Sequence, residues 1–185
     1  VPGQVLDNLL TQVWRAYQDE VILTDLMRVY ALEAEPVIAR FLLEKVIPLP
    51  VGQVLDPAIA QGFISATYGR FIGKSCERLL LTLSALGFLG RYDGRLVVKG
   101  IPTPADAFLI LLHDRLAPTP RIVRLSDILA APWWQLLGCR EPATIRAILR
   151  QAEEAGLIAR YARVDELEQV TTRYARGDYI QQARR

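Results

Sequence analysis

Basic side chains recur at helical and hairpin spacing in two separate parts of the chain. The first part contains Lys74, Arg78, Arg91, Arg95 and Lys99. The second part contains a series of arginines and one threonine, on a predicted helix, on the turn before it and around a second hairpin: Arg140, Thr144, Arg146, Arg150, Arg160, Arg163, Arg173 and Arg176. Guanidinium groups bind phosphate oxygens in a two-pronged geometry, so both parts are candidate sites for contact with a nucleic-acid backbone.

Other chemistry finds less support in the sequence. The segment GRFIGKS, residues 69–75, resembles a phosphate loop, but three residues separate its glycines where that loop needs four, and a predicted helix precedes it. His113, the only histidine, stands in an apolar helix without a second histidine or a cysteine pair, which favours a core role over a metal ligand. Ser75, Cys76 and Ser84 have no neighbouring base. The sequence therefore predicts neither catalysis nor a metal or other cofactor.

The elements that position the first basic group are predicted over residues 73–99. Apolar residues follow helical spacing after Ser75, the expected cap, and Gly87 is expected to end the helix in a left-handed conformation. An extended segment then leads to Asp93 and Gly94, a pair that favours a tight hairpin turn because both turn residues need positive φ. The sequence thus predicts a helix followed at once by a two-stranded hairpin.

A similar order of elements returns near the C-terminus. Pro142 opens a second apolar-faced helix, and Gly156 is its expected stop. Two strands are expected over residues 157–164 and 170–174. The turn between them is acidic, and its glutamates, among them Glu168, are expected to face solvent. Gly87 and Gly156 lie 69 residues apart, which favours a tandem duplication.

The remaining segments are mostly predicted helices. Residues 4–18 are expected to form an amphipathic helix, and Thr24 is the expected cap of the next helix, over 25–32. A short strand is expected over 121–125. Further helix starts are marked by a capping side chain or a first-turn proline at Pro36, Asp56-Pro57, Thr103-Pro104 and Ser126.

Composition bounds the class of protein. The chain has 185 residues, 51% of them hydrophobic, with 22 basic and 20 acidic side chains. It contains no apolar run of membrane-spanning length and no signal-peptide pattern. Cys76 and Cys139 stand in apolar helical contexts without metal-ligand spacing, which fits a reduced cytoplasmic location. Residues 1–50 hold 4 basic and 7 acidic side chains, whereas residues 51–150 hold 12 and 7, so the middle of the chain is mildly basic.

The helix-plus-hairpin pattern resembles the winged helix-turn-helix superfamily of bacterial transcription factors. The first copy reads SCERLLLTLSALGFL and the second TIRAILRQAEEAGLI. The resemblance implies a mainly α fold: tandem winged helix-turn-helix units over residues 51–100 and 101–185, each with a short β-hairpin wing, after an N-terminal helical region over 1–50. In this superfamily the last helix can enter the major groove of duplex DNA, and the wing can reach the adjacent backbone. The C-terminal pattern, with Trp133 and Trp134 expected in the core, also resembles the small DNA-binding accessory proteins of phage-exclusion (BREX) islands.

We therefore expect a non-enzymatic protein that binds double-stranded DNA, in regulation, genome maintenance or phage defence. Its N-terminal helices are expected to form a homodimer, for which residues 4–18 offer an amphipathic stripe, or to bind a protein partner. The alternative is a winged-helix adaptor that mediates protein–protein assembly. The low net charge, the acidic first fifty residues, and Glu77 and Leu81 on the outer side of the first predicted recognition helix favour this alternative. A third possibility, suggested by the absence of an initial Met, is an accessory fragment of a larger enzyme.

Overall fold

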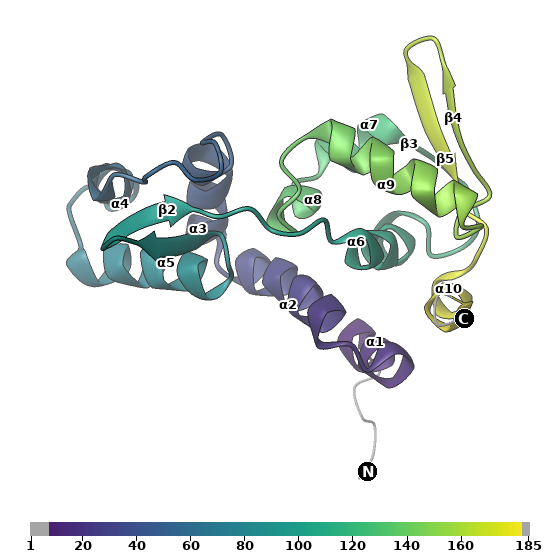
Figure 1. Ribbon diagram of the computed structural model, residues 1–185, viewed down its shortest axis with the longest axis horizontal. Coiled ribbons are helices and arrows are strands. Elements are labelled where there is room, and N and C mark those ends of the chain that lie inside the picture. The colour runs from purple at the N-terminus through teal and green to yellow at the C-terminus, as the bar shows by residue number, and fades with distance from the viewer. Residues whose placement is uncertain (1–7, 183–185) are drawn as a thin grey trace. The chain divides into compact units, whose positions relative to one another are not determined.

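The chain folds into two compact units, shown in the computed structural model of Figure 1, which describes residues 8–182. Unit 1 combines the described residues up to Met27 with those from Pro104 onward, and unit 2 is Arg28–Thr103. Helix α2 (Glu20–Ala34) begins in unit 1 and ends in unit 2. The N-terminal region predicted over 1–50 is thus divided between the units, and both are mainly helical, with one small antiparallel sheet each.

Unit 1 begins with α1 (Leu9–Tyr17), whose cap Asn8 accepts a hydrogen bond from the backbone N of Thr11. Residues 4–7 of the helix predicted over 4–18 lie outside the described residues. The β-strands form a sheet in the order β3-β5-β4. After α1 and the first part of α2, the elements are α6 (Ala105–Leu111), the π-helical turn η2 (Leu112–Leu116), β3 (Ile122–Arg124), α7 (Leu125–Ala130), α8 (Trp133–Leu136), α9 (Pro142–Glu154), β4 (Arg160–Val164), β5 (Leu167–Thr171) and α10 (Arg176–Gln182).

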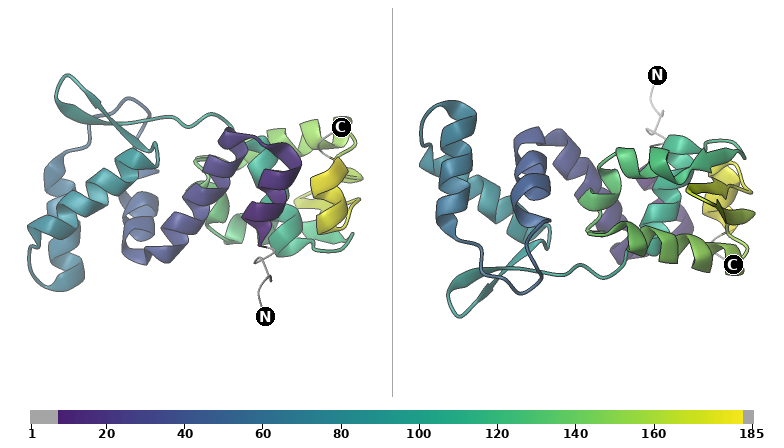
Figure 2. Two further views of the ribbon diagram at one scale, coloured as in Figure 1. Left: turned by 90° about the horizontal axis from the view of Figure 1, so that it is seen from below. Right: turned by 90° about the horizontal axis from the view of Figure 1, so that it is seen from above.

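Unit 2 has a similar construction. After the end of α2 come α3 (Pro36–Phe41), the π-helical turn η1 (Leu42–Val46), α4 (Pro57–Tyr68), α5 (Gly73–Ala85), β1 (Leu89–Tyr92) and β2 (Arg95–Val98). Residues 52–55 pair with β2 as a short third strand: the N of Leu55 donates to the O of Leu96, and the N of Val98 donates to the O of Gln53. Helix α5 lies between α4 and the β1–β2 hairpin (Figure 2).

The two units repeat one order of elements, which extends the similarity seen in the sequence. In each, an α-helix that widens into a π-helical turn precedes a short strand. One or two further helices follow, and then a 13-residue helix and a hairpin. The short strand pairs with the last strand of the hairpin in both units. The prolines after the π-helical turns, Pro48 and Pro118, lie 70 residues apart. The buried Leu55, which ends the short strand of unit 2, and the buried Leu125, which directly follows β3, are also 70 residues apart.

One difference between the repeats has a simple cause. Helix α4 is continuous through Gly62, whereas the corresponding stretch of unit 1 is broken into α7 and α8 at Pro132, 70 residues later. Proline removes a helical donor and clashes with the preceding turn. The side chains after this point are buried in both units, namely Phe63 in unit 2 and Trp133 in unit 1. The proline therefore interrupts the helix, but the aromatic side chain that follows it is buried in both units.

Several predicted local features are confirmed. Pro36 and Pro57 occupy the first turns of α3 and α4, and Asp56 accepts a hydrogen bond from the N of Ala58 as the cap of α4. Gly87 has φ +84°, and Asp93 and Gly94 form a two-residue turn with φ of 48° and 74°. Positive φ at both turn positions matches the twist of the strands.

The predicted serine and threonine caps are wrong. Helix α2 begins before Thr24, at Glu20, because the carboxylate of Asp19 accepts from the backbone N of Val21 and Ile22. Ser75 and Ser126 lie inside α5 and α7, which begin at Gly73 and Leu125. Helix α6 follows Pro104 without a side-chain cap, so Thr103 has no capping role. A capping residue type marks a start only where its side chain meets unsatisfied amides.

The core of unit 1 contains the residues predicted there. Trp133 stacks on Phe108 with ring centroids 5.0 Å apart, and Trp134 is also buried. His113 is completely buried, and its Nδ1 bonds to the carbonyl of Leu109 at 2.8 Å. Within residues 8–182, no helix combines the length and apolar character needed to cross a membrane.

The buried thiol of Cys139 provides a test of this core. Burial, with a smaller effect of Asp25, raises its pKa to about 12. In a Cys76→Ser variant at pH 8, we expect Cys139 to react with a thiol reagent about three orders of magnitude more slowly in the native protein than in urea, because the thiolate is the reactive form. Absorbance of the released chromophore measures both rates. Comparable rates would show that Cys139 is accessible in the native protein.

Candidate nucleic-acid interface

The second basic group is positioned by α9 and the hairpin of β4 and β5. Helix α9 buries Ile145, Ile148, Leu149 and Ala152, which leaves Arg146 and Arg150 off the buried face and one turn apart. On β4, Tyr161 and Arg163 are two residues apart and therefore point to one face of the hairpin. Glu168 of β5 lies opposite Arg163 on the same face. We call these five residues the α9–hairpin cluster: Arg146, Arg150, Tyr161, Arg163 and Glu168.

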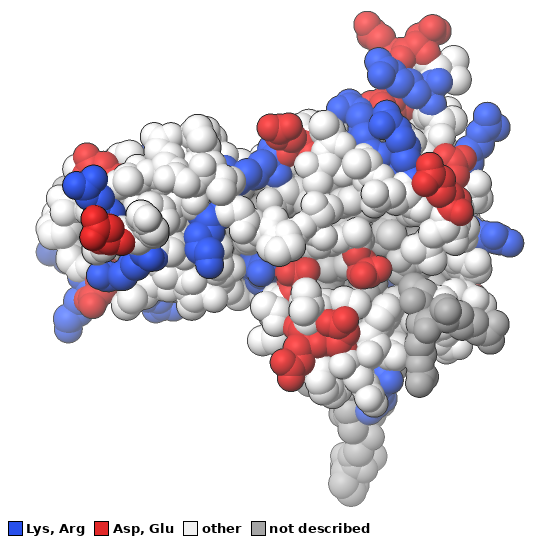
Figure 3. Space-filling view, viewed as in Figure 1, with Lys and Arg blue, Asp and Glu red and all other residues white. Residues whose placement is uncertain are grey.

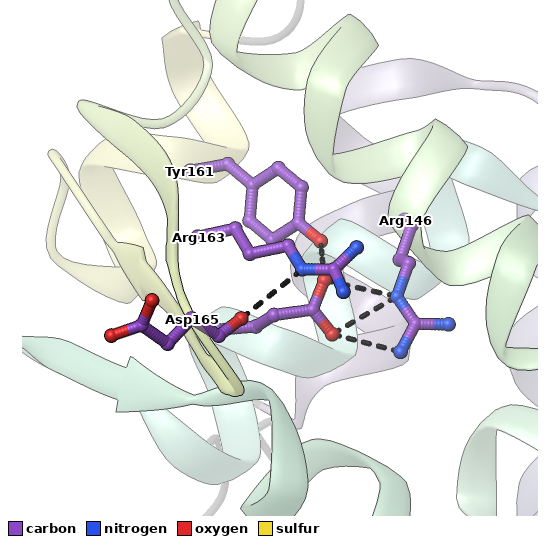
Figure 4. A network of polar contacts seen from close by, with 5 residues as sticks. Arg146, Tyr161, Arg163 and Asp165 are labelled. Atoms are coloured by element: carbon purple, nitrogen blue, oxygen red, sulfur yellow. Dashed lines mark hydrogen bonds and ion pairs between the residues drawn. The ribbon is translucent and has the colours of Figure 1, made fainter.

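Arg146 forms a forked ion pair with Glu168 at the centre of this cluster (Figure 4). Its Nε donates to both carboxylate oxygens at 3.0 Å, and its Nη2 donates to Oε2 at 2.8 Å. The hydroxyl of Tyr161 donates to Oε1 of Glu168 at 2.6 Å. These bonds to Arg146 and Tyr161 hold the pKa of Glu168 at about 2, so the carboxylate is charged at neutral pH.

The prediction that Glu168 faces solvent is wrong, and Arg146, a predicted contact for nucleic acid, bonds to Glu168 within the protein. The side chain of Glu168 is only 10% exposed and joins α9 to the hairpin, whereas the sequence predicted a solvated face. Arg146 makes three hydrogen bonds to Glu168, so its guanidinium joins α9 to the hairpin. The signal in the sequence is the seven-residue spacing of Tyr161 and Glu168 across a two-residue turn.

Arg150 and Arg163 remain exposed at the edges of the cluster. Burial raises the pKa of Tyr161, and the charge of Arg150 lowers it by a smaller amount. The charge of Arg163 lowers the pKa of Glu168. Both guanidinium groups are therefore close to the central ion pair. Arg163 also donates from Nε to the carbonyl of Asp165 at 3.4 Å, a long contact (Figure 4). Three arginines and one carboxylate give the cluster a net charge of +2.

The structure places the other predicted residues of unit 1 outside this cluster. Arg160 is exposed on the opposite face of the hairpin, and Arg173 lies over the ring of Tyr174. Arg176 is half-buried and bonds to Asp114 at 2.9 Å, so it anchors α10 to η2. Arg140 and Thr144 are half-buried, and burial lowers the pKa of Arg140.

The first basic group lies on α5 and the β1–β2 hairpin of unit 2. Lys74 is exposed in the first turn of α5, and α4 precedes it, which agrees with the prediction against a phosphate loop. Arg78 is exposed but forms an ion pair with Glu35. A cavity of about 150 Å³ opens beside that pair, lined also by Tyr68 and Ser75. Sites for small-molecule ligands usually measure about 300 Å³ or more, so this cavity is too small for most of them.

The hairpin of unit 2 carries its basic residues at the surface. Arg91, Arg95 and Lys99 are all exposed. The sequence reasoning missed Tyr92, which stands between them at the turn with 76% of its surface exposed. Its exposure could have been predicted from the alternation of side chains along the strand. Leu89 points inward, so Tyr92, three residues later, points away from the core.

Charged side chains gather on the faces of both units, with Lys and Arg mixed with Asp and Glu over α9 and its hairpin (Figure 3). Among residues 8–182, no group of three or more His, Cys, Asp or Glu side chains could hold a metal ion. No family model, curated protein or solved structure matches this chain.

Proposed function

We propose that this protein binds double-stranded DNA through tandem winged helix-turn-helix units and has no enzymatic activity. The observation that carries the proposal is the α9–hairpin cluster, in which an ion pair joins the hairpin to α9 while Arg150 and Arg163 remain exposed. The repeated order of elements supports the winged-helix assignment in both units. The first strand of each unit pairs with the last strand of its hairpin, so the hairpin stands where the superfamily carries a wing.

The exposed face of α9 fits a major groove. It presents Ala143 and Ala147, whose small side chains permit close approach, beside Arg150 and Gln151, which can hydrogen-bond to base edges. In this proposal Arg163 contacts the adjacent phosphate backbone from the wing. In unit 2, Lys74 of α5 and Arg91, which lies on the same face of β1 as the buried Leu89, provide a second and smaller contact.

A titration of duplex DNA at several salt concentrations tests the proposal. We expect the wild type to bind a random-sequence 20-base-pair duplex with an affinity that falls steeply with salt, because binding releases condensed counterions. An Arg150→Ala/Arg163→Ala variant should bind about tenfold or more weakly, with the salt slope reduced by about 2. Fluorescence anisotropy of a labelled duplex gives both quantities.

The matched control removes the same charge elsewhere. Arg15 and Lys45 are exposed and lie outside both hairpins, so an Arg15→Ala/Lys45→Ala variant should bind as the wild type does. Equal affinities for all three proteins would contradict a role for the α9–hairpin cluster. Absence of binding by the wild type at low salt would contradict the proposed function itself.

A protein-binding adaptor is the second candidate, favoured by three exposed aliphatic side chains. Leu81 is 58% exposed on the outer face of α5, where a groove-binding helix would carry polar groups. Val164 and Leu167 are exposed at the tip of the unit 1 hairpin, beside the acidic turn of Asp165 and Glu166. An adaptor would bind duplex DNA weakly and independently of salt, and affinity purification would recover a stable protein partner.

A further inference from the structure

The hairpin of unit 2 has an inner face and an outer face. Leu89 and Val98 lie opposite each other in the register of β1 and β2, so they point to the same face. Both are buried, which makes this the inner face. Side chains alternate along a strand, so Tyr92 and Arg95, the pair that closes the turn, point outward. Tyr92 is the most exposed of the large hydrophobic side chains in the described part of the chain, at 76%. Covering this ring would remove apolar surface from water and so gain free energy.

Lys99 extends the same outer face. A Cβ atom on Gly90 would stand 2.7 Å from Cδ of Lys99, so the lysine stem lies directly over this glycine. Because Gly90 and Tyr92 are two residues apart on β1, the space over Gly90 is on the side to which Tyr92 points. Val97 lies opposite Gly90 and pairs with Val54, which adds an apolar floor. The outer face thus combines one exposed ring, two cations and an aliphatic floor.

The hairpin of unit 1 shows that this surface is not needed to form the turn. Its turn also begins with an aspartate at positive φ, Asp165 at 54° compared with Asp93 at 48°. The pair that closes it is Val164 and Leu167 where unit 2 has Tyr92 and Arg95. The aromatic and basic pair is therefore particular to unit 2, and the two hairpins have diverged in the chemistry they expose.

We propose that the outer face of the unit 2 hairpin binds single-stranded nucleic acid. Tyr92 stacks on one unpaired base, and Arg95 and Lys99 contact the phosphates on either side of it. A ring between two cations suits this ligand because base stacking needs an exposed π-face and the backbone needs positive charge. A paired base offers no such face except at an end. This site is separate from the α9–hairpin cluster, so it does not depend on duplex binding by unit 1.

Oligonucleotides with and without bases test this proposal. We would measure the affinity of the protein for a labelled 15-nucleotide dT strand and for a strand of the same length made of abasic units, which has the same charge. The wild type should prefer the dT strand by about fivefold or more. Tyr92→Ala should lose this preference while keeping its affinity for the abasic strand, and Tyr92→Phe should retain the preference.

Val164→Ala is the matched control, since it changes the equivalent position of the unit 1 hairpin and should leave both affinities unchanged. Circular dichroism of each variant verifies folding. Equal affinity of the wild type for the two strands, no binding to either strand at low salt, or a preference that survives in Tyr92→Ala would each overturn the proposal. An Arg150→Ala/Arg163→Ala variant that loses duplex binding but keeps its preference for dT would separate this site from the proposed duplex site.

Discussion

Replacing Arg146 with alanine is expected to lower the free energy of unfolding of unit 1 by about 2–3 kcal/mol. The substitution leaves the carboxylate of Glu168, whose side chain is 10% exposed, with Tyr161 as its remaining hydrogen-bond donor. A charged group deprived of its partner in such a place costs about 3–5 kcal/mol, and the 33% exposure of the Arg146 side chain reduces that figure. Urea denaturation followed by tryptophan fluorescence measures the effect, because Trp14, Trp133 and Trp134 all belong to unit 1.

At acidic pH the free energies of unfolding of the wild type and of Arg146→Ala should become equal. The pKa of Glu168 is about 2 in the folded protein and 4.5 ordinarily, so the ion pair stabilises the protein fully above pH 4.5, and this stability is lost as the pH falls from 4.5 towards 2. Arg150→Ala, on the same helix, should change the unfolding free energy by less than about 0.5 kcal/mol. A variant as stable as the wild type at pH 7 would contradict the role assigned to Arg146.

The parts of the fold that the sequence predicted are those fixed by local backbone chemistry. The capping residue Asp56 before Pro57, the helix stop Gly87 and the turn Asp93-Gly94 were all found at their predicted positions. Each of these sites favours a residue type that few others can replace. The long helices α5 and α9 were predicted within three residues of their starts, because their apolar stripes span several turns.

The parts that the sequence did not predict depend on contacts between distant residues. Glu168 was expected in an acidic turn, but it lies in β5, which begins at Leu167 because a two-residue turn at Asp165 and Glu166 sets the register with β4. Helix α10 was not predicted at all, since it is held by contacts such as that between Arg176 and Asp114, 62 residues apart. A pattern of local spacing carries no information about such partners.

The two candidate surfaces differ although the two units share one order of elements. Both units keep the apolar positions of the helix before the hairpin, Leu79 in one and Ile148 in the other, since these hold the core. The outward positions have no such constraint, and 69 residues after the exposed Leu81 the second copy has Arg150. A repeated fold can therefore keep its packing while its exposed side chains differ.

His113 should make the stability of unit 1 depend on pH near neutrality. Its ring is fully buried, stacks on Tyr179 with ring centroids 4.0 Å apart, and bonds through Nδ1 to the carbonyl of Leu109. Because a carbonyl only accepts, Nδ1 carries the proton, and Nε2 is buried without a hydrogen-bond partner among the described residues. Protonation of Nε2 would place a charge in this core, so burial lowers the pKa of His113.

The sign of the effect follows from which state binds the proton. Between the lowered pKa of the folded protein and 6.5, the unfolded chain binds more protons at this histidine than the folded protein does. Stability is therefore complete above pH 6.5 and falls as the pH decreases towards the folded pKa, with a slope of at most about 1.4 kcal/mol per pH unit. Tyr179, which stacks on the ring, and Tyr17 and Asp106, which act on Tyr179, have raised pKa values, and the two tyrosines stay neutral throughout. His113→Phe keeps the stacked ring without a titrating nitrogen. Urea denaturation between pH 7.5 and 5.5 should therefore show a slope in the wild type that is absent from His113→Phe, and equal slopes in the two proteins would place the titrating group elsewhere.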